Sequence, residues 1–301
     1  MIEEYVYDFK PRCAIVMAPW ELERLRYTVE KSKAVMKAGH GYMNIGIKRA
    51  DKYVEVRVLD GTCKGYVVRI DPSVFKKTEI DQKKMYVVSD ENVSVVEIRS
   101  GKYYKLLPTV PTSYPSLEIS GIHMHRIWNS DPKQDTIQKI RAARIRRGDI
   151  VLDTCMGLGY TAIWSAKRGA HRVYTVEIDP NVIDIAEQNP WSWELDRDNI
   201  MTIKGNVTRL IREFPDNFFD KIIHDPPRIS AETGDLYGSE FYRELYRVLK
   251  PGGVLFHYTG NPGKKKKGNF PGRVASRLKN AGFSKVLIRV EEALGVVAFK
   301  E

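Results

Sequence analysis

The sequence is poor in cysteine and has no long apolar run. Its three cysteines, Cys13, Cys63 and Cys155, lie far apart, and none belongs to a CxxC pair or a Cys/His ligand spacing. We therefore expect neither a zinc site nor a disulfide framework. No apolar stretch reaches the ~20 residues that a membrane helix needs. Acidic residues and a proline interrupt the start, MIEEYVYDFKPR, where a signal peptide would have its apolar core. The sequence predicts a cytoplasmic protein without a membrane segment.

Internal repeats of fixed period are also missing, and two regions differ in pattern. With 301 residues the chain is long enough for two domains. Residues 1–110 predict a small α+β or mostly β module, because one helical stretch precedes several alternating ones. The helical stretch is 21–38, and the alternating stretches are 52–60, 65–70, 84–89 and 94–99. The stretch LPTVPTSYPS (107–116), rich in Pro, Ser and Thr, is the predicted linker.

Residues 111–301 alternate short apolar strands with amphipathic helices. The expected strands are 149–154, 172–178, 200–205, 220–225, 253–259, 285–290 and 295–300, with helices starting near 160, 180, 207, 239 and 272. This alternation predicts an α/β fold with a doubly wound, mainly parallel sheet. Ligands of such sheets bind beyond the C-terminal ends of the strands, and the motifs below all fall there.

The first of these strands runs into the glycine loop DTCMGLGYT (153–161). Gly157 and Gly159 allow a tight turn and a close approach of a ligand. Ala162 stands where a dinucleotide motif has its third glycine, so an ordinary turn before a helix is an alternative. Glu177 ends the second strand about twenty residues further on, the position from which an acid binds both hydroxyls of a ribose.

Two polar residues at neighbouring strand ends have simpler interpretations. Asp179 precedes Pro180 and is expected to cap a helix. Asn206 follows the third strand, where it either contacts an adenine amino group or caps the next helix.

The fourth strand ends in HDPPR (224–228). The two prolines fix their own φ angles and restrict the residue before each of them, so the carbonyls of Asp225 and Pro226 have set directions. A carboxylate beside a fixed carbonyl offers two acceptors, which suit the two hydrogens of an amino group. Such bonds favour the pyramidal nitrogen that attacks an electrophile, and the alternative is a merely rigid turn.

Four motifs, in this order, resemble the class I S-adenosylmethionine-dependent methyltransferases. They are DxxxGxG at 153–159, the acid at Glu177, DPP at 225–227 and LKPGGVLFHYTG at 249–260. The resemblance covers roughly residues 120–301. It implies a seven-stranded sheet whose last strand pair includes one antiparallel strand, with S-adenosylmethionine as cofactor.

The resemblance also implies the roles of individual residues. The implied cofactor-binding residues are Asp153, Cys155, Gly157, Gly159, Tyr160, Thr161, Glu177, Ile178 and Asn206, with His123 and His125 in the segment where amino-methylating relatives wrap the cofactor. The implied catalytic residues are His224, Asp225, Pro226, Pro227 and Arg228. The family usually has Asp where Asn206 stands, which leaves the adenine contact open.

Arg228 departs from the family pattern, in which an aromatic residue follows DPP and stacks on the target base. A guanidinium can stack on a base, grip a phosphate or pair with an acid. Tyr258, Tyr237 and Trp191 are other candidates for stacking, and core packing is the alternative for Trp191. His224, His257, His123 and His125 fall on the same face, where we expect packing or hydrogen bonds and no metal.

The charge pattern concerns the substrate. The formal net charge is +11, and Lys264, Lys265, Lys266 and Lys267 lie between two glycines. Both features favour a polyanion, whereas a lysine-rich thermophile surface and a solvated loop are the alternatives. RNA is favoured over DNA because no insertion for target recognition is evident, and the N-terminal module would dock it.

HDPPR and DTCMGLGYTA are similar to segments of archaeal methyltransferases, one family of which methylates cytidine N4 in ribosomal RNA. The resemblance thus predicts a methyltransferase acting on an exocyclic amine of a nucleobase in RNA. Methyl or aminopropyl transfer to a small amine on the same fold is an alternative. A non-catalytic RNA-binding protein and a protein-binding N-terminal module are two more.

Overall fold

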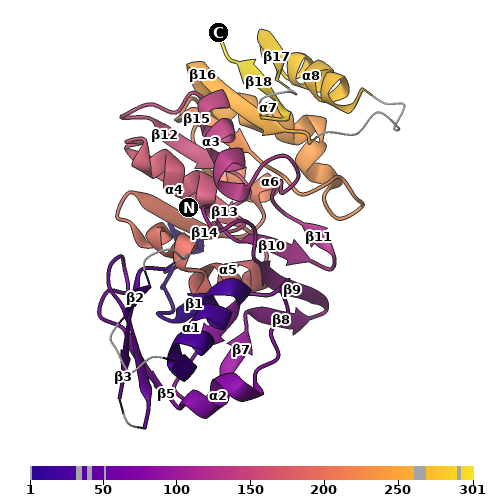
Figure 1. Ribbon diagram of the computed structural model, residues 1–301. Helices are drawn as coiled ribbons and strands as arrows, with labels where there is room; N and C mark the ends of the chain where they lie inside the picture. Colours follow the sequence, from indigo (N-terminus) through magenta and orange to yellow (C-terminus); the bar gives the residue numbers. More distant parts are fainter. Residues whose placement is uncertain (1, 32–35, 39–42, 51, 261–268, 290–292) are drawn as a thin grey trace. The chain divides into compact units, whose positions relative to one another are not determined.

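The computed structural model describes all of residues 1–301 except 1, 32–35, 39–42, 51, 261–268 and 290–292 (Figure 1). The chain forms two compact units. The first, called the α/β unit here, contains residues 1–9, 135–180 and 195–301. The second, the β-rich unit, contains residues 10–134 and 181–194.

Seven strands in the described part of the α/β unit form one sheet, in the order β14-β13-β12-β15-β16-β18-β17. The strands are β12 (Ile150–Asp153), β13 (Arg172–Glu177), β14 (Ile200–Lys204), β15 (Phe219–His224), β16 (Leu249–Tyr258), β17 (Lys285–Arg289) and β18 (Gly295–Phe299). The first five are parallel, and β18 runs antiparallel to both of its neighbours. The prediction of a seven-stranded, mainly parallel sheet with an extra β-rich domain is confirmed.

The central strands are buried on both faces. Val151, Leu152 and Asp153 are buried in succession although they point alternately to the two sides of the sheet. Strand β15 has four buried residues in a row from Lys221 to His224. Such strands read as continuous apolar runs and place polar residues at their ends.

Helices accompany this sheet. They are α3 (Pro132–Ala142), α4 (Tyr160–Lys167), α6 (Val207–Leu210), α7 (Ser239–Val248) and α8 (Phe270–Asn280). Helices α6, α7 and α8 share one apolar core with the sheet, into which Tyr242, Leu245 and Leu278 are fully buried. The order of the strands reverses between β12 and β15, which makes the C-terminal ends of these two strands the expected binding position.

In the described residues of the β-rich unit, three small sheets are antiparallel, in the orders β1-β6-β7, β2-β3-β4-β5 and β11-β10-β9-β8. The strands are β1 (Ile15–Met17), β2 (Met36–Ala38), β3 (Ile45–Arg49), β4 (Val54–Val58), β5 (Val67–Ile70), β6 (Tyr86–Val88), β7 (Val93–Val95), β8 (Glu97–Ser100), β9 (Lys102–Leu107), β10 (Ser116–Ile119) and β11 (Ile122–His123). Helices α1 (Pro19–Lys31), α2 (Pro72–Lys77) and most of α5 (Pro180–Gln188) belong to this unit. The proline-rich stretch 107–116 joins β9 to β10, which pair with each other.

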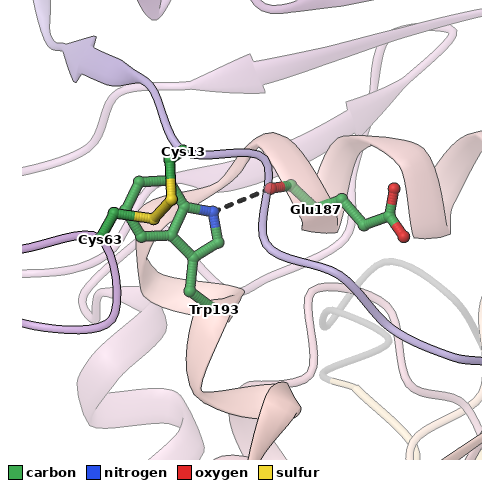
Figure 2. The surroundings of a disulfide bond; sticks show 4 residues. All are labelled: Cys13, Cys63, Glu187 and Trp193. Atoms are coloured by element: carbon green, nitrogen blue, oxygen red, sulfur yellow. Dashed lines mark hydrogen bonds between the residues drawn. A yellow bond between two sulfur atoms is a disulfide. The ribbon is translucent and has the colours of Figure 1, made fainter. Parts of the chain in front are cut away.

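A disulfide links Cys13 to Cys63 within the β-rich unit (Figure 2). The expectation of no disulfide is therefore wrong. The two cysteines are 50 residues apart in sequence, yet their Cα atoms are 5.5 Å apart. No local motif marks such a pair, because the fold and not the spacing brings it together. Nearby in Figure 2, the indole nitrogen of Trp193 donates to the carbonyl of Glu187 at 2.8 Å.

No helix in the described part of the chain has both the length and the hydrophobicity that a membrane crossing requires.

Candidate functional site at the strand ends of the α/β unit

The glycine loop lies directly after β12. Gly157 and Gly159 have positive φ angles of 54° and 74°, which favour glycine. A Cβ on Gly159 would lie 2.5 Å from the Leu195 side chain, whereas a Cβ on Gly157 would meet open space. Close packing thus requires the second glycine, and the first leaves room beside the backbone. Tyr160 and Thr161 begin α4 and are buried.

Asp153 ends β12 and is fully buried. Its Oδ2 accepts hydrogen bonds from the hydroxyls of Thr161, at 3.0 Å, and Thr175, at 2.8 Å. Its Oδ1 is also buried and has no hydrogen-bond partner among the described residues. Burial raises the pKa of Asp153 to about 7, against the effect of the two hydroxyls. A buried acceptor without a donor indicates a site for a donor that the chain itself does not supply.

Glu177 ends β13 and accepts three backbone amides. Its Oε1 receives the N–H groups of Ile178 and Asp179, both at 2.9 Å, and its Oε2 receives that of Gly157 at 3.0 Å. Burial raises the pKa of Glu177 to about 7, against these bonds. The carboxylate thus joins the end of β13 to the glycine loop. A carboxylate has about four acceptor positions, so one remains in addition to these three.

Asn206 caps α6. Its Oδ1 accepts from the backbone N–H of Thr208 at 3.0 Å and from the Thr208 hydroxyl at 2.8 Å. Ile178, next to Glu177, is 60% exposed, which is high for an apolar residue at a strand end. Cys155 is the free cysteine of the described chain, and burial raises its pKa well above the usual range, so it is not a reactive thiolate.

Asp225 follows β15, one strand away from Asp153. The loop after β12 is linked to β15, because Thr154 donates its N–H to the Ile223 carbonyl at 3.0 Å. Asp225 Oδ2 lies 2.6 Å from the ammonium nitrogen of Lys139, a residue of α3. The side chain of Asp225 is 20% exposed, so the carboxylate still reaches the surface. Burial raises the pKa of Asp225, and the Lys139 cation counters this effect.

Hydrogen bonds from Tyr237 and Arg277 support the diproline turn. Pro226 is buried and Pro227 is exposed. The Tyr237 hydroxyl donates to the Pro227 carbonyl at 2.8 Å, and Arg277 donates to the Tyr237 carbonyl at 3.0 Å. Tyr237 itself is only 4% exposed, so the structure uses it to support the turn rather than to present a ring.

His224 lies inside the sheet below Asp225. Its Nε2 lies 2.9 Å from the Leu236 carbonyl, so Nε2 donates, and its Nδ1 accepts from the Thr154 hydroxyl at 2.7 Å. Burial lowers its pKa to about 4. In His257 the two nitrogens have exchanged roles: Nδ1 donates to the Tyr258 carbonyl at 2.8 Å, and Nε2 accepts from the Tyr242 hydroxyl at 2.8 Å. Both rings are neutral supports of the strand ends.

Tyr258 and Arg228 flank Asp225 in different ways. Tyr258 ends β16 next to β15, and its ring centroid is 4.4 Å from Lys139 Nζ. Arg228 is exposed, and no ion pair of its side chain is found among the described residues. Of the predicted stacking groups in this unit, the Tyr258 ring thus lies against the Lys139 ammonium that pairs with the carboxylate, and the Arg228 side chain is exposed.

The remaining predicted residues are not part of the described α/β unit. His123, His125 and Trp191 belong to the β-rich unit, where His123 contacts Glu118 at 3.2 Å and His125 contacts Ser116 at 3.2 Å. The run Lys264–Lys267 lies outside the described residues. No group of His, Cys, Asp and Glu side chains that could hold a metal is found in the described part of the chain.

Sequence reasoning missed Lys139 and Asp135. Helix α3 buries a stripe that contains Asp135, Thr136, Lys139 and Ile140, spaced as one helical face. Two charged residues on an otherwise buried face were the available signal, because burying a charge requires a partner.

Comparison with known proteins identifies the fold and its chemistry. A family model described as "Methyltransferase domain" matches residues 151–253. The uncharacterized protein MJ1233 of Methanocaldococcus jannaschii is 50% identical over 228 residues, which cover 75% of this chain and 77% of that protein. The chain and this protein belong to one family. The matched region, with its seven-stranded sheet, is a class I S-adenosylmethionine-dependent methyltransferase domain.

More distant relatives share parts of this methyltransferase. Ribosomal RNA large subunit methyltransferase I of Aeromonas hydrophila is 32% identical over 125 residues, which cover 39% of this chain and 32% of that protein. The chain thus matches about a third of its length. Spermidine synthase from Thermotoga maritima has a TM-score of 0.54 at 18% identity, covering 90% of this chain and 82% of that one. At this identity the likeness concerns the fold alone.

The residues of the methyltransferase fit S-adenosylmethionine, its cofactor. The buried Oδ1 of Asp153 lacks a donor among the described residues and suits the ammonium of the methionine part. The open space beside Gly157 allows the ligand to approach the protein backbone closely. Glu177 is the expected ribose acceptor, although Gly157 N–H occupies part of its capacity. Two hydroxyls therefore bind there only if the Gly157 amide gives way.

Proposed function

We propose that this methyltransferase modifies an exocyclic amino group of a nucleobase in RNA, and that the target is cytidine N4 of ribosomal RNA. The observation that carries the proposal is the Asp225 carboxylate, which precedes a rigid diproline and is paired with Lys139, whose ammonium also contacts the Tyr258 ring. The acceptors support an exocyclic amine as the target, and the net charge and the distant relatives support RNA as the substrate.

The acceptors in the proposed mechanism are Asp225 Oδ1 and the Pro226 carbonyl. Asp225 Oδ2 is engaged by Lys139, and the Pro227 carbonyl is engaged by Tyr237. The two acceptors that remain hold both hydrogens of an –NH₂ group and orient its nitrogen. Tyr258 or Arg228 supports the plane of the base. When bound, S-adenosylmethionine would supply the methyl group, whose bond to the sulfonium sulfur breaks as the amine nitrogen attacks, so that S-adenosylhomocysteine is the leaving group. Asp225 or water takes the proton that the amine loses.

Five exposed arginines in the α/β unit support an RNA acceptor. They are Arg141, Arg144, Arg146, Arg147 and Arg168, at the end of α3, in the loop before β12 and after α4. The two segments lie side by side, since Gly148 N–H donates to the Gly169 carbonyl at 2.9 Å. No ion pair of these arginines is found in the part of the chain that the structure describes. They add to the net charge of +11 a local surface that suits phosphates.

The nucleoside content of RNA tests the proposal. Ribosomal RNA from a strain without this gene is compared by mass spectrometry with RNA from its parent and from a strain that regains the gene. We expect one methylated cytidine to disappear and to return with the wild-type gene, but not with an Asp225→Ala gene. Unchanged RNA nucleosides would overturn the RNA proposal. Disappearance of a different methylated base would keep the enzyme class and correct the target.

Binding in solution tests the phosphate surface separately. Replacing Arg144, Arg146 and Arg147 with Glu should weaken RNA binding. It should also reduce the slope of log K against log salt by roughly 0.7 to 0.9 for each phosphate that is no longer neutralised. Neutralising Lys264–Lys267 is the matched comparison, because the sequence expects a phosphate contact there as well. An unchanged slope in the arginine variant would make that surface merely solvated.

An RNA acceptor also implies a cytoplasmic enzyme, which we include in the proposal. A disulfide in that compartment is unusual in mesophiles but frequent in intracellular proteins of hyperthermophiles.

A further inference from the structure

A buried lysine contacts the proposed acceptor carboxylate. The Nζ atom of Lys139 lies 2.6 Å from Asp225 Oδ2 and 2.7 Å from Asp135 Oδ2. The lysine side chain is 2% exposed, and the Tyr258 ring centroid lies 4.4 Å from the same nitrogen. Lys139 thus meets the charged and aromatic groups of three elements, α3, β16 and the turn after β15.

This arrangement satisfies the charge of Lys139. An ammonium without a partner is costly to bury, and burial alone would lower its pKa. The two carboxylates outweigh burial and raise the pKa of Lys139 above its usual range. The side chain is therefore a permanent cation near neutral pH. It does not act as a base, and its two ion pairs hold it in position.

The contact constrains Asp225. One carboxylate oxygen is engaged by an ammonium that is itself fixed by Asp135, so rotation of the Asp225 side chain would break a charged hydrogen bond. The other oxygen, Oδ1, has no hydrogen bond to the described residues. With Oδ2 held inward and the residue 20% exposed, Oδ1 is the acceptor left for a ligand.

We propose that Lys139 is a positioning residue for methyl transfer, which fixes Asp225 as an ionised hydrogen-bond acceptor and thereby selects a neutral aromatic amine as the acceptor. This inference rests on the proposed function, because it assumes that Asp225 contacts the acceptor.

The selection follows from basicity. The amino group of a nucleobase is neutral at pH 7 and needs only acceptors for its two hydrogens. An aliphatic amine is protonated at pH 7 and must first lose a proton to a base. A carboxylate that is paired with an ammonium is a weaker base than the same carboxylate alone, since the cation favours its charged form. Lys139 therefore suits the first class of acceptor and disfavours the second.

Other titratable groups also face Asp225 and influence a pH profile. They are Asp135 and Lys139 from α3, Asp153 and Cys155 at the end of β12, and Tyr237 in the turn before α7, while Tyr258 at the end of β16 faces Lys139. Of these groups, Lys139 is the cation that lowers the pKa of Asp225. Its replacement with an uncharged residue should therefore raise that pKa.

Four variants of Lys139 and its partner separate charge from packing. Lys139→Met removes the charge, Lys139→Gln keeps a donor without charge, and Lys139→Arg keeps the charge. The double variant Lys139→Met with Asp135→Asn removes charge from both partners, so a buried carboxylate is not left without its cation if Lys139→Met fails to fold. Methyl transfer to ribosomal RNA is measured from pH 5 to 9, with S-adenosylmethionine affinity by calorimetry.

We expect kcat to fall about 100-fold in Lys139→Met and in the double variant, as for a misplaced reacting group, with little change in cofactor affinity. Because the cation holds the Asp225 pKa down, its loss should move the acidic limb of the kcat/KM profile up by about one pH unit or more. Lys139→Arg should keep the wild-type limb, and Lys139→Gln should shift it as Met does. Folded Met variants with wild-type kcat and limb would overturn the positioning role.

The wild-type enzyme is assayed in parallel with ribosomal RNA and with 1,3-diaminopropane as acceptors. Transfer to RNA alone supports the selection of a neutral amine. Transfer to the diamine alone overturns the proposed function and the selection together. In that case the same variants still test the positioning of Asp225, because the pH profile is then measured with the diamine.

Discussion

Different interactions stabilise each of the two units of the chain. Strands of the α/β unit are buried on both faces, and a large apolar core joins its sheet to α6, α7 and α8. The β-rich unit has three small antiparallel sheets in its described residues, a smaller core around Ile15, Leu22 and Phe75, and the Cys13–Cys63 disulfide. The unit that carries the cofactor residues thus depends on burial, whereas the other adds a covalent link. We therefore expect substitutions in the α/β unit to affect catalysis and cofactor binding, and loss of the disulfide to affect the stability of the β-rich unit.

The largest expected effect is on chemistry in the α/β unit. Asp225→Ala should lower kcat by about 1,000-fold, because it removes an acceptor that orients the amine. Cofactor affinity should change less than about threefold, since Asp153 and Glu177 are untouched. Single-turnover methylation and calorimetry measure the two quantities. Asp225→Asn, which keeps an acceptor oxygen, is the control and should fall between wild type and Ala. A large loss of cofactor affinity would place Asp225 in the wrong part of the site.

The next effect concerns stability in the β-rich unit. Cys13→Ser removes a link between residues that are 50 positions apart. From the entropy of loop closure, this loss should lower the free energy of unfolding by about 4 kcal/mol. Two-unit proteins need not unfold in one step, so calorimetry should show one transition moving to lower temperature and the other staying. Cys155→Ser is the matched control, as it replaces the free cysteine. If both transitions move together, the units are not independent and the comparison fails.

A smaller effect is expected at the cofactor loop. Glu177→Gln puts an amide where three N–H groups donate, so both the loop and the ribose lose acceptor strength. We expect the Kd for S-adenosylmethionine to rise about 10- to 100-fold, or 1.4–2.8 kcal/mol. Added cofactor should stabilise the α/β unit less than in wild type, by the mass-action relation. Wild-type affinity measured by calorimetry would remove the ribose role from Glu177.

The smallest effect is a pH dependence. Burial raises the pKa of Asp153 to about 7, above its value in the unfolded chain. The folded state therefore binds more protons, so this group contributes stability at low pH that is lost as the pH rises toward and through 7. Asp153→Asn should remove this contribution, so cofactor-free protein should lose less stability between pH 5.5 and 8. Urea unfolding at both pH values measures it. An unchanged difference would mean that Asp153 is not the group responsible.

Much of the α/β unit was predictable because its signals are local. Apolar runs followed by glycine, acid or proline marked β12, β13 and β15, and the motifs at their ends marked Asp153, Glu177 and Asp225. Local chemistry also offered Asn206 as a cap of α6, but it did not decide between cap and ligand, since both use the same side chain.

The rest depended on contacts between distant residues. Lys139 and Asp225 are 86 positions apart, and Cys13 and Cys63 are 50 apart. Strands β1, β2, β3, β9, β10 and β11 were not predicted, because short antiparallel strands carry weak periodicity, and the helix expected over 21–38 ends at Lys31. The roles of Tyr237 and His224 changed for the same reason. Whether a ring supports a turn or faces a ligand is decided by its neighbours in space, which the sequence does not give.

On the proposed ribose role of Glu177, the three backbone amides that its carboxylate accepts have a kinetic consequence. The glycine loop is satisfied by its own chain, so entry of the cofactor exchanges hydrogen bonds instead of simply adding them. Association then includes a step in which Gly157 N–H leaves Glu177, and the observed rate should level off at high cofactor concentration. When the product leaves, the Gly157 N–H returns to Glu177, and this returning hydrogen bond would speed product release. The ribose contact would then influence the turnover rate as well as the affinity.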